Sequence, residues 1–152
     1  MNNKSAFQLE LDEARAQCGY DFMGLAMVQP AEYHYVIRWV YVSGNRNERY
    51  RRIVLRSGKG IAGIVFKTGK PLLIPSMEQY AEADSLFNYP IVQSEQLRSV
   101  VAVPLWREGR VEGVLLGAYR DDRCVNETML QQLTRQAQDG FQNIHDIEEV
   151  SP

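Results

Sequence analysis

The stretch that decides the fold is Leu55–Pro75, which reads LRSGKGIAGIVFKTGKPLLIP. It contains a glycine-rich turn, a short apolar run and a further glycine, Gly69. Glycine adopts positive φ angles at little cost, so it marks the places where helices end and chains turn. We expect a short helix over Ile64–Thr68 that Gly69 closes, followed by a short strand over Pro71–Pro75. This arrangement predicts a small helix packed against a sheet.

The segments on both sides of this stretch are rich in β-branched and aromatic residues, which favour strands. Turn residues at Gln29–Glu32 and Ser43–Asn45 separate the earlier runs, and the turn at Arg107–Arg110 predicts a hairpin. The long connection Ser76–Gln96 lacks sustained periodicity, and we expect short helices within it. The predicted strands are Tyr20–Val28, Tyr33–Val42, Arg51–Arg56, Pro71–Pro75, Ser99–Trp106 and Val111–Tyr119.

Both ends of the chain have the apolar spacing of amphipathic helices. Ser5–Cys18 is followed by Gly19, a favourable C-terminal stop. Asn126 is a favourable N-cap for a helix that runs toward Val150. The order of elements predicts an α+β fold, an antiparallel sheet with helices on its faces. The apolar stripe of each terminal helix has two interpretations. It either covers the sheet or forms a surface that pairs two copies of the chain.

The composition sets limits on the class of protein. The chain has 152 residues, enough for one domain over residues 1–152. Its net charge of −2 gives no overall preference for nucleic acid. The densest basic stretch, Arg46–Arg56, is interpreted as a solvated sheet edge. No apolar run is long enough to span a bilayer, and the N-terminus lacks the features of a secretory signal. With Cys18 and Cys124 far apart, we expect a cytoplasmic protein without a disulfide.

Two stretches together resemble one family closely. They are Leu55–Pro75, quoted above, and Leu97–Gly117, which reads LRSVVAVPLWREGRVEGVLLG. In the GAF family a glycine-rich turn opens a short helix beside the ligand pocket. A hairpin with a sequence like that of Leu97–Gly117 forms the middle of the sheet. The resemblance covers roughly residues 20–140. It implies a GAF-type antiparallel sheet with the terminal helices on one face and a ligand pocket on the other.

A narrower resemblance is carried by WVYVSGNRNERYRRIVLRSGKGIAG, residues 39–63. This stretch is similar to the nitrate-receptor members of the GAF family. Those proteins work with a sensor histidine kinase and its response regulator. The resemblance implies a nitrate receptor that modulates such a kinase, restraining phosphorylation when the pocket is empty. It implies no cofactor other than the nitrate ligand.

The turn Gly60–Ile61–Ala62–Gly63 supplies a physical argument for an anion site. The first N–H groups of a helix lack intrahelical acceptors and lie at the positive end of its dipole, so they hold a small anion without a charged side chain. Nitrate, which is weakly hydrated, suits an apolar cage, whereas phosphate is expected to demand arginine or lysine. The resemblance places the anion on the amides of Ile61 and Ala62. It implies pocket walls formed by Trp39, Tyr89, Pro90 and Ile91.

Other interpretations stay open. Trp39 could be a core residue, Tyr89–Ile91 could anchor the long connection, and the glycine turn could serve packing alone. A methionine sulfoxide reductase of GAF type would use cysteines, yet Cys18 and Cys124 both lie outside the predicted pocket segments. A third alternative is a dimerisation module without a small ligand. The two histidines of the chain are too few and too far apart in the sequence to predict a metal site. The sequence signatures of cyclic-nucleotide binding and of bilin binding are missing.

Overall fold

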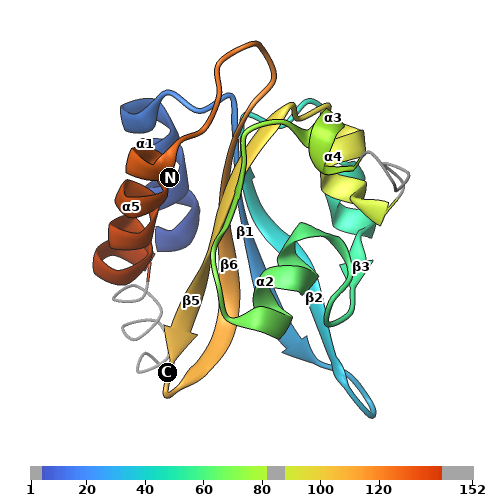
Figure 1. Ribbon diagram of the computed structural model, residues 1–152. Coiled ribbons are helices and arrows are strands. Elements are labelled where there is room, and N and C mark those ends of the chain that lie inside the picture. The colour runs from blue at the N-terminus through green and yellow to red at the C-terminus, as the bar shows by residue number, and fades with distance from the viewer. Residues whose placement is uncertain (1–4, 82–87, 142–152) are drawn as a thin grey trace.

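The computed structural model describes residues 5–81 and 88–141. Its centre is an antiparallel sheet of six strands in the order β3-β2-β1-β6-β5-β4 (Figure 1). The long middle strands β1, β6 and β5 are buried for most of their length. The strands are β1 (Phe22–Pro30), β2 (Tyr35–Ser43), β3 (Val54–Leu55), β4 (Leu72–Ile74), β5 (Ser99–Arg107) and β6 (Arg110–Tyr119).

Helices cover both faces of this sheet, which confirms the predicted α+β architecture. The terminal helices α1 (Ala6–Cys18) and α5 (Glu127–Gln136) lie on one face, and a π-helical turn, η3 (Ala137–Phe141), continues α5. The opposite face carries α2 (Gly60–Thr68), α3 (Met77–Tyr80) and α4 (Pro90–Glu95), as Figure 1 shows. Residues 142–150 of the predicted last helix and residues 82–87 of the long connection lie outside the described residues.

The predicted caps Gly19 and Asn126 are confirmed, and Ser5, expected only as the first residue of its helix, is an N-cap as well. The Ser5 hydroxyl accepts a hydrogen bond from the amide of Gln8 at 3.2 Å, and Asn126 accepts one from Met129 at 3.0 Å. Gly19 ends α1 with a φ of 74°. Both apolar stripes face the sheet, where they form one core of fully or nearly buried side chains. This core includes Phe7, Leu11, Leu25, Val101, Leu115, Leu133 and Phe141.

A second core fills the face under α2, α3 and α4. A β-bulge in β2 decides which side chains enter it, because the pairing moves from Leu25↔Tyr41 to Ala26↔Trp39 and leaves Val40 without a partner. A bulge inserts one residue and so reverses the alternation of side chains. Trp39 therefore faces α2, whereas Tyr41 faces α1 and stacks against Phe7 at 5.4 Å between ring centroids.

Several predicted boundaries were wrong. The run Arg51–Arg56 is not one strand, because a 3-10 turn, η1 (Arg49–Arg52), buries Tyr50 in the second core and leaves only β3 as strand. β1 continues through Pro30, and the turn lies at residues 31–34, closed by a 2.7 Å hydrogen bond from the amide of Ala31 to the carbonyl of His34. α2 begins at Gly60 rather than at Ile64.

The helices in the described ranges offer no candidate for crossing a lipid bilayer, since none combines enough length with enough apolar character.

Candidate functional site

The first turn of α2 has no side-chain cap among the described residues. Lys59 precedes the helix and its side chain makes no capping hydrogen bond. The amide of Lys59 donates to the carbonyl of Arg56 at 2.9 Å, so this group is already satisfied. The next amides, of Gly60, Ile61 and Ala62, lie in the turn where a helix provides no acceptor for its own N–H groups. They form the donor set that the sequence predicts for a small anion.

The two glycines of this turn have packing reasons of their own. Gly60 has a φ of +69°, and a Cβ atom there would lie 3.0 Å from Leu55. A Cβ atom on Gly63 would lie 2.4 Å from the carbonyl oxygen of Arg56. The carbonyl of Gly63 accepts a 2.8 Å hydrogen bond from the amide of Gly58, which holds the turn against the helix. These contacts support a packing role for both glycines, and anion binding by the neighbouring amides stays a prediction.

Trp39 lies in the same core as this turn. Its side chain is 3% exposed and belongs to the cluster that contains Ile61 and Ala62. The indole ring covers Gly24 of β1, where a Cβ atom would come within 2.9 Å of Trp39 Cε3. Within the described part of the chain, the buried Nε1–H of Trp39 has no hydrogen-bond acceptor. A buried donor without an acceptor is rare and requires an explanation.

The beginning of α4 completes the group of predicted site residues. Tyr89 precedes the helix, Pro90 occupies its first turn, and Ile91 is 2% exposed. The Tyr89 ring packs edge-on against Tyr80 with centroids 5.7 Å apart. Tyr89 and Ile91 share the core cluster of Trp39, whereas Pro90 is half-buried. The fold thus brings together, on one face of the sheet, residues that lie far apart in the sequence; their role in binding a ligand stays a prediction.

The other end of α4 is held by a buried carboxylate that the sequence did not single out. Glu95 is fully buried, and its Oε1 accepts hydrogen bonds from the amide of Arg46 at 2.8 Å and from the Arg120 guanidinium. Arg120 Nε also donates to the carbonyl of Glu95 at 2.8 Å. Glu95 Oε2 is buried and has no partner among the described residues. No local pattern identifies such a pair, because it depends on the packing of α4 against the end of β6.

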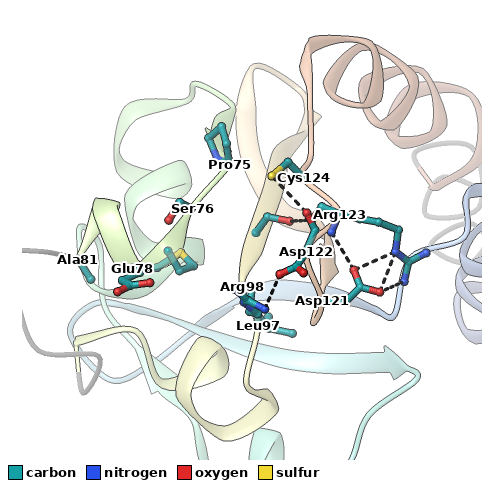
Figure 2. A pocket seen from close by; sticks show the side chains of 12 residues that line it. Pro75, Ser76, Glu78, Ala81, Leu97, Arg98, Asp121, Asp122, Arg123 and Cys124 are labelled. Atoms are coloured by element: carbon teal, nitrogen blue, oxygen red, sulfur yellow. Dashed lines mark hydrogen bonds and ion pairs between the residues drawn. The ribbon is translucent and has the colours of Figure 1, made fainter.

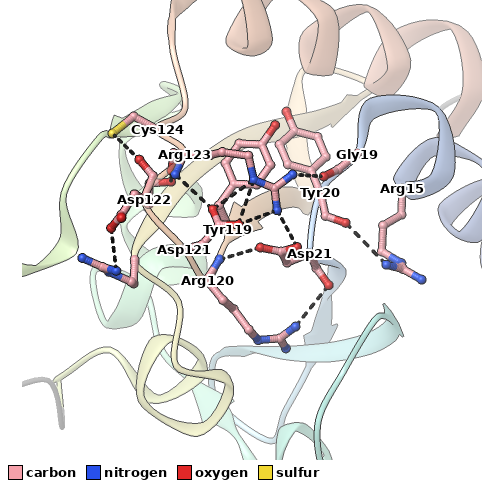
Figure 3. A network of polar contacts seen from close by, with 12 residues as sticks. Arg15, Gly19, Tyr20, Asp21, Tyr119, Arg120, Asp121, Asp122, Arg123 and Cys124 are labelled. Atoms are coloured by element: carbon pink, nitrogen blue, oxygen red, sulfur yellow. Dashed lines mark hydrogen bonds and ion pairs between the residues drawn. The ribbon is translucent and has the colours of Figure 1, made fainter.

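Arg120 also belongs to a polar network at the beginning of β1 (Figure 3). Its amide donates to Asp21 Oδ2 at 2.8 Å, and its guanidinium donates to the Asp21 carbonyl at 3.2 Å. Asp21 Oδ1 accepts from Arg123 at 2.8 Å. Arg123 also binds Asp121, and this hydrogen bond holds the pKa of the Asp121 carboxyl below its usual value. The network joins α4 to the residues next to both terminal helices.

A cavity of about 430 Å³ lies between Pro75–Ala81 and the loop Asp121–Cys124 (Figure 2). Arg98 and Asp122 line it and form an exposed ion pair of 2.9 Å. The exposed Cys124 lines it as well, and its thiol lies 3.7 Å from the Asp122 carbonyl. Cys18 instead packs against the core under the terminal helices. Neither thiol lies in the cluster of Trp39, and in residues 5–81 and 88–141 no three His, Cys, Asp or Glu residues gather as metal ligands do.

Solved structures support the architecture and show which proteins the chain resembles. A mutated NreA protein from Staphylococcus aureus, whose printed description refers to its nitrate binding site, has 43% identity and a TM-score of 0.74, covering 80% of this chain and 88% of its own. A second such NreA structure from the same organism has 40% identity and a TM-score of 0.74, with coverage of 83% and 96%. A free methionine-R-sulfoxide reductase from Neisseria meningitidis shares the fold at 17% identity, with a TM-score of 0.70 and coverage of 95% and 80%.

Curated sequences and the family comparison agree with this result. The Nif-specific regulatory protein of Azospirillum lipoferum is 37% identical over 83 residues, which is 53% of this chain and only 13% of that protein. The chain therefore spans a small part of this longer relative. Residues 2–138 match the GAF domain model, which covers most of the chain. By this match, by the fold and by the NreA structures, the chain belongs to the GAF domain family.

Proposed function

We propose that this GAF domain is a nitrate receptor. In this proposal nitrate binds between the first turn of α2 and Trp39, with Tyr89, Pro90 and Ile91 as further walls. The amides of Ile61 and Ala62 donate to the anion, with Gly60 and Gly63 shaping the turn. The similarity to NreA proteins with a nitrate binding site supports the choice of ligand.

The single observation that carries the proposal is the unpaired indole donor of Trp39. Nε1–H is buried in the same cluster as the first turn of α2 and has no acceptor among the residues described. Leaving such a donor unpaired costs about 1–3 kcal/mol. An anion that accepts from both the indole and the α2 amides removes this cost and satisfies the helix N-terminus.

The character of the surrounding core favours a weakly hydrated anion. Apart from polar atoms such as the Trp39 indole and the Tyr50 and Tyr89 hydroxyls, the side chains of this cluster are apolar. Phosphate is strongly hydrated and is normally held by arginine or lysine, and neither residue type is among the buried residues of the described ranges. Nitrate has a lower desolvation cost, and a few neutral donors in an apolar cage are sufficient to bind it.

The wider role in this proposal is signalling in the cytoplasm without catalysis. Nitrate occupancy changes how the domain contacts a sensor histidine kinase of a two-component system. In this proposal the outer surface of the terminal helices α1 and α5 pairs two copies of the chain. The positions of Cys18 and Cys124, both outside the Trp39 cluster, support a sensor rather than a methionine sulfoxide reductase.

Titration calorimetry with nitrate, nitrite, chloride, phosphate, cyclic GMP and methionine sulfoxide tests this proposal. We expect heat of binding from nitrate and none from phosphate, cyclic GMP or the sulfoxide. A Trp39→Phe variant keeps an aromatic ring and removes the donor. Its nitrate affinity should fall about tenfold or more, since a hydrogen bond to a charged group is worth about 1.5–3 kcal/mol.

Trp106→Phe is the matched control, because Trp106 is the second tryptophan of the chain and is 43% exposed. This variant should bind nitrate as the wild type does. The proposal is wrong if nitrate gives no heat with the folded wild type. An unchanged affinity of folded Trp39→Phe would assign Trp39 to the core alone.

A further inference from the structure

Three arginines from separate parts of the chain line one cavity at the C-terminal end of α4. Arg46 follows β2, Arg98 precedes β5, and Arg120 follows β6. The cavity has a volume of about 500 Å³, and none of the described residues that line it carries a carboxylate side chain. Gln93 and Gln96 of the α4 region also line it. We call this feature the arginine cavity.

The guanidinium groups of the arginine cavity are held in place to different degrees. Arg120 has a side chain only 12% exposed and is fixed by Glu95 beneath it. Arg46 is exposed and donates to the side-chain oxygen of Gln96 at 2.5 Å, which is a neutral acceptor. Arg46 also lines a neighbouring cavity with Asp21 and Asp121. Gln96 has a φ of 55°, unfavourable for a residue other than glycine. This costly conformation ends α4 and places the Gln96 side chain beside Arg46.

The surface next to the cavity is also basic. Arg49, Arg51 and Arg52 of η1 are exposed, and η1 contacts α4. One carboxylate, Glu48, lies in this stretch and approaches Arg51 at 3.7 Å. Arg98 is paired with Asp122, whose side chain is 94% exposed and can move away. The whole chain has a net charge of −2, so this positive surface is local.

We propose that the arginine cavity is a docking site for an acidic segment of a partner protein. Arginine pairs with carboxylates through two parallel hydrogen bonds, so a cavity with exposed guanidinium groups suits aspartate and glutamate side chains. A long nucleic acid fits less well, because no aromatic side chain of residues 5–81 and 88–141 lines the cavity and the rest of the chain is negative. This inference rests on the proposed sensor function and specifies a surface where its partner binds.

The position of the cavity connects it to the proposed nitrate site. α4 begins at Tyr89–Ile91, the predicted wall, and ends at Glu95, which binds both Arg46 and Arg120. η1 contributes Tyr50 to the same core cluster as Trp39. A shift of α4 that accompanies nitrate binding would therefore move the arginines relative to one another. Partner affinity and nitrate affinity would then be coupled reciprocally.

Fluorescence anisotropy with a labelled peptide that contains six consecutive glutamates tests the docking site. The wild type should bind this peptide, with an affinity that falls as salt rises. The double variant Arg46→Gln/Arg98→Gln should bind at least about tenfold more weakly. It leaves the main-chain bond of Arg46 to Glu95 and the buried Arg120 intact, and its thermal unfolding should confirm a native fold.

The control is Arg56→Gln/Arg135→Gln, which removes two exposed arginines outside the cavity and changes the net charge equally. It should change peptide affinity less than about twofold, as expected for screened surface charges. Equal losses in the two double variants would overturn the proposal, as would no peptide binding by the wild type or tighter binding of an oligothymidylate or inorganic phosphate. Nitrate calorimetry on the same proteins reports separately on the proposed ligand, so either proposal can fail while the other stands.

Discussion

Arg120 holds the fully buried carboxylate of Glu95 at the junction of α4 and β6. Its guanidinium donates to both the side chain and the main-chain carbonyl of Glu95. The Arg120 amide binds Asp21, so one residue connects α4, β6 and the beginning of β1. The wall of the predicted nitrate site is thus anchored to the end of the sheet by an ion pair.

Removing one member of this pair should destabilise the protein strongly. In Arg120→Met the Glu95 carboxylate stays buried without its cationic partner, which typically costs about 3–5 kcal/mol. Urea unfolding followed by circular dichroism measures this loss. Arg98→Met removes the partner of the exposed Asp122 and should cost less than about 1 kcal/mol. Similar losses of unfolding free energy in the two variants would show that the buried pair stabilises the protein no more than the exposed pair does.

Adding a methyl group at Gly24 should disturb Trp39. A Cβ atom there would lie 2.9 Å from the indole, so Gly24→Ala forces the ring to move and should cost about 1–3 kcal/mol. Gly117→Ala is the matched variant on the opposite face, where a Cβ atom would lie 2.7 Å from the Tyr20 ring. Both should lower the unfolding midpoint, but only Gly24→Ala should weaken nitrate binding in calorimetry. Equal effects on nitrate would contradict the assigned site.

Replacing Ala62 with proline tests the main-chain donor directly. Proline has no N–H and is tolerated in the first turn of a helix, so Ala62→Pro should weaken nitrate binding in a protein that still folds. Ala62→Gly keeps the amide and should bind nitrate about as well as the wild type. Thermal unfolding checks both folds, since Ala62 is completely buried. If folded Ala62→Pro binds nitrate normally, this amide is not a ligand.

Tyr20 should make the protein sensitive to alkaline pH. Burial, with the nearby Cys18 and Tyr119, raises the pKa of the Tyr20 phenol well above its ordinary value. The unfolded chain releases this proton near pH ~10 while the folded protein retains it. The contribution of Tyr20 is therefore fully present below that pH and is lost as pH rises toward the folded pKa. Tyr20→Phe should show a shallower fall in unfolding free energy above pH ~10, whereas Tyr33→Phe, at an 88% exposed tyrosine, should follow the wild type.

Local sequence signals predicted much of the architecture. Gly19 and Asn126 identified two helix ends because capping depends on residues within one turn. The hairpin of β5 and β6 followed from strand-forming residues on both sides of a short turn. The glycine turn identified the region where α2 begins, even though the helix itself starts four residues earlier than expected.

Tertiary packing decided what these signals leave open. The bulge at Val40 directs Trp39 toward α2, and the burial of Tyr50 converts a predicted strand into η1. Glu95 finds its partners 49 residues away at Arg46 and 25 residues away at Arg120. The sequence alone determined the family, the layers and the glycine turn that opens α2, because caps, turns and alternation act between near neighbours. Only the tertiary structure decided which face of the sheet each side chain of β2 occupies, which residues form the buried ion pair and which arginines line the arginine cavity. These features depend on contacts between segments that are distant in the sequence.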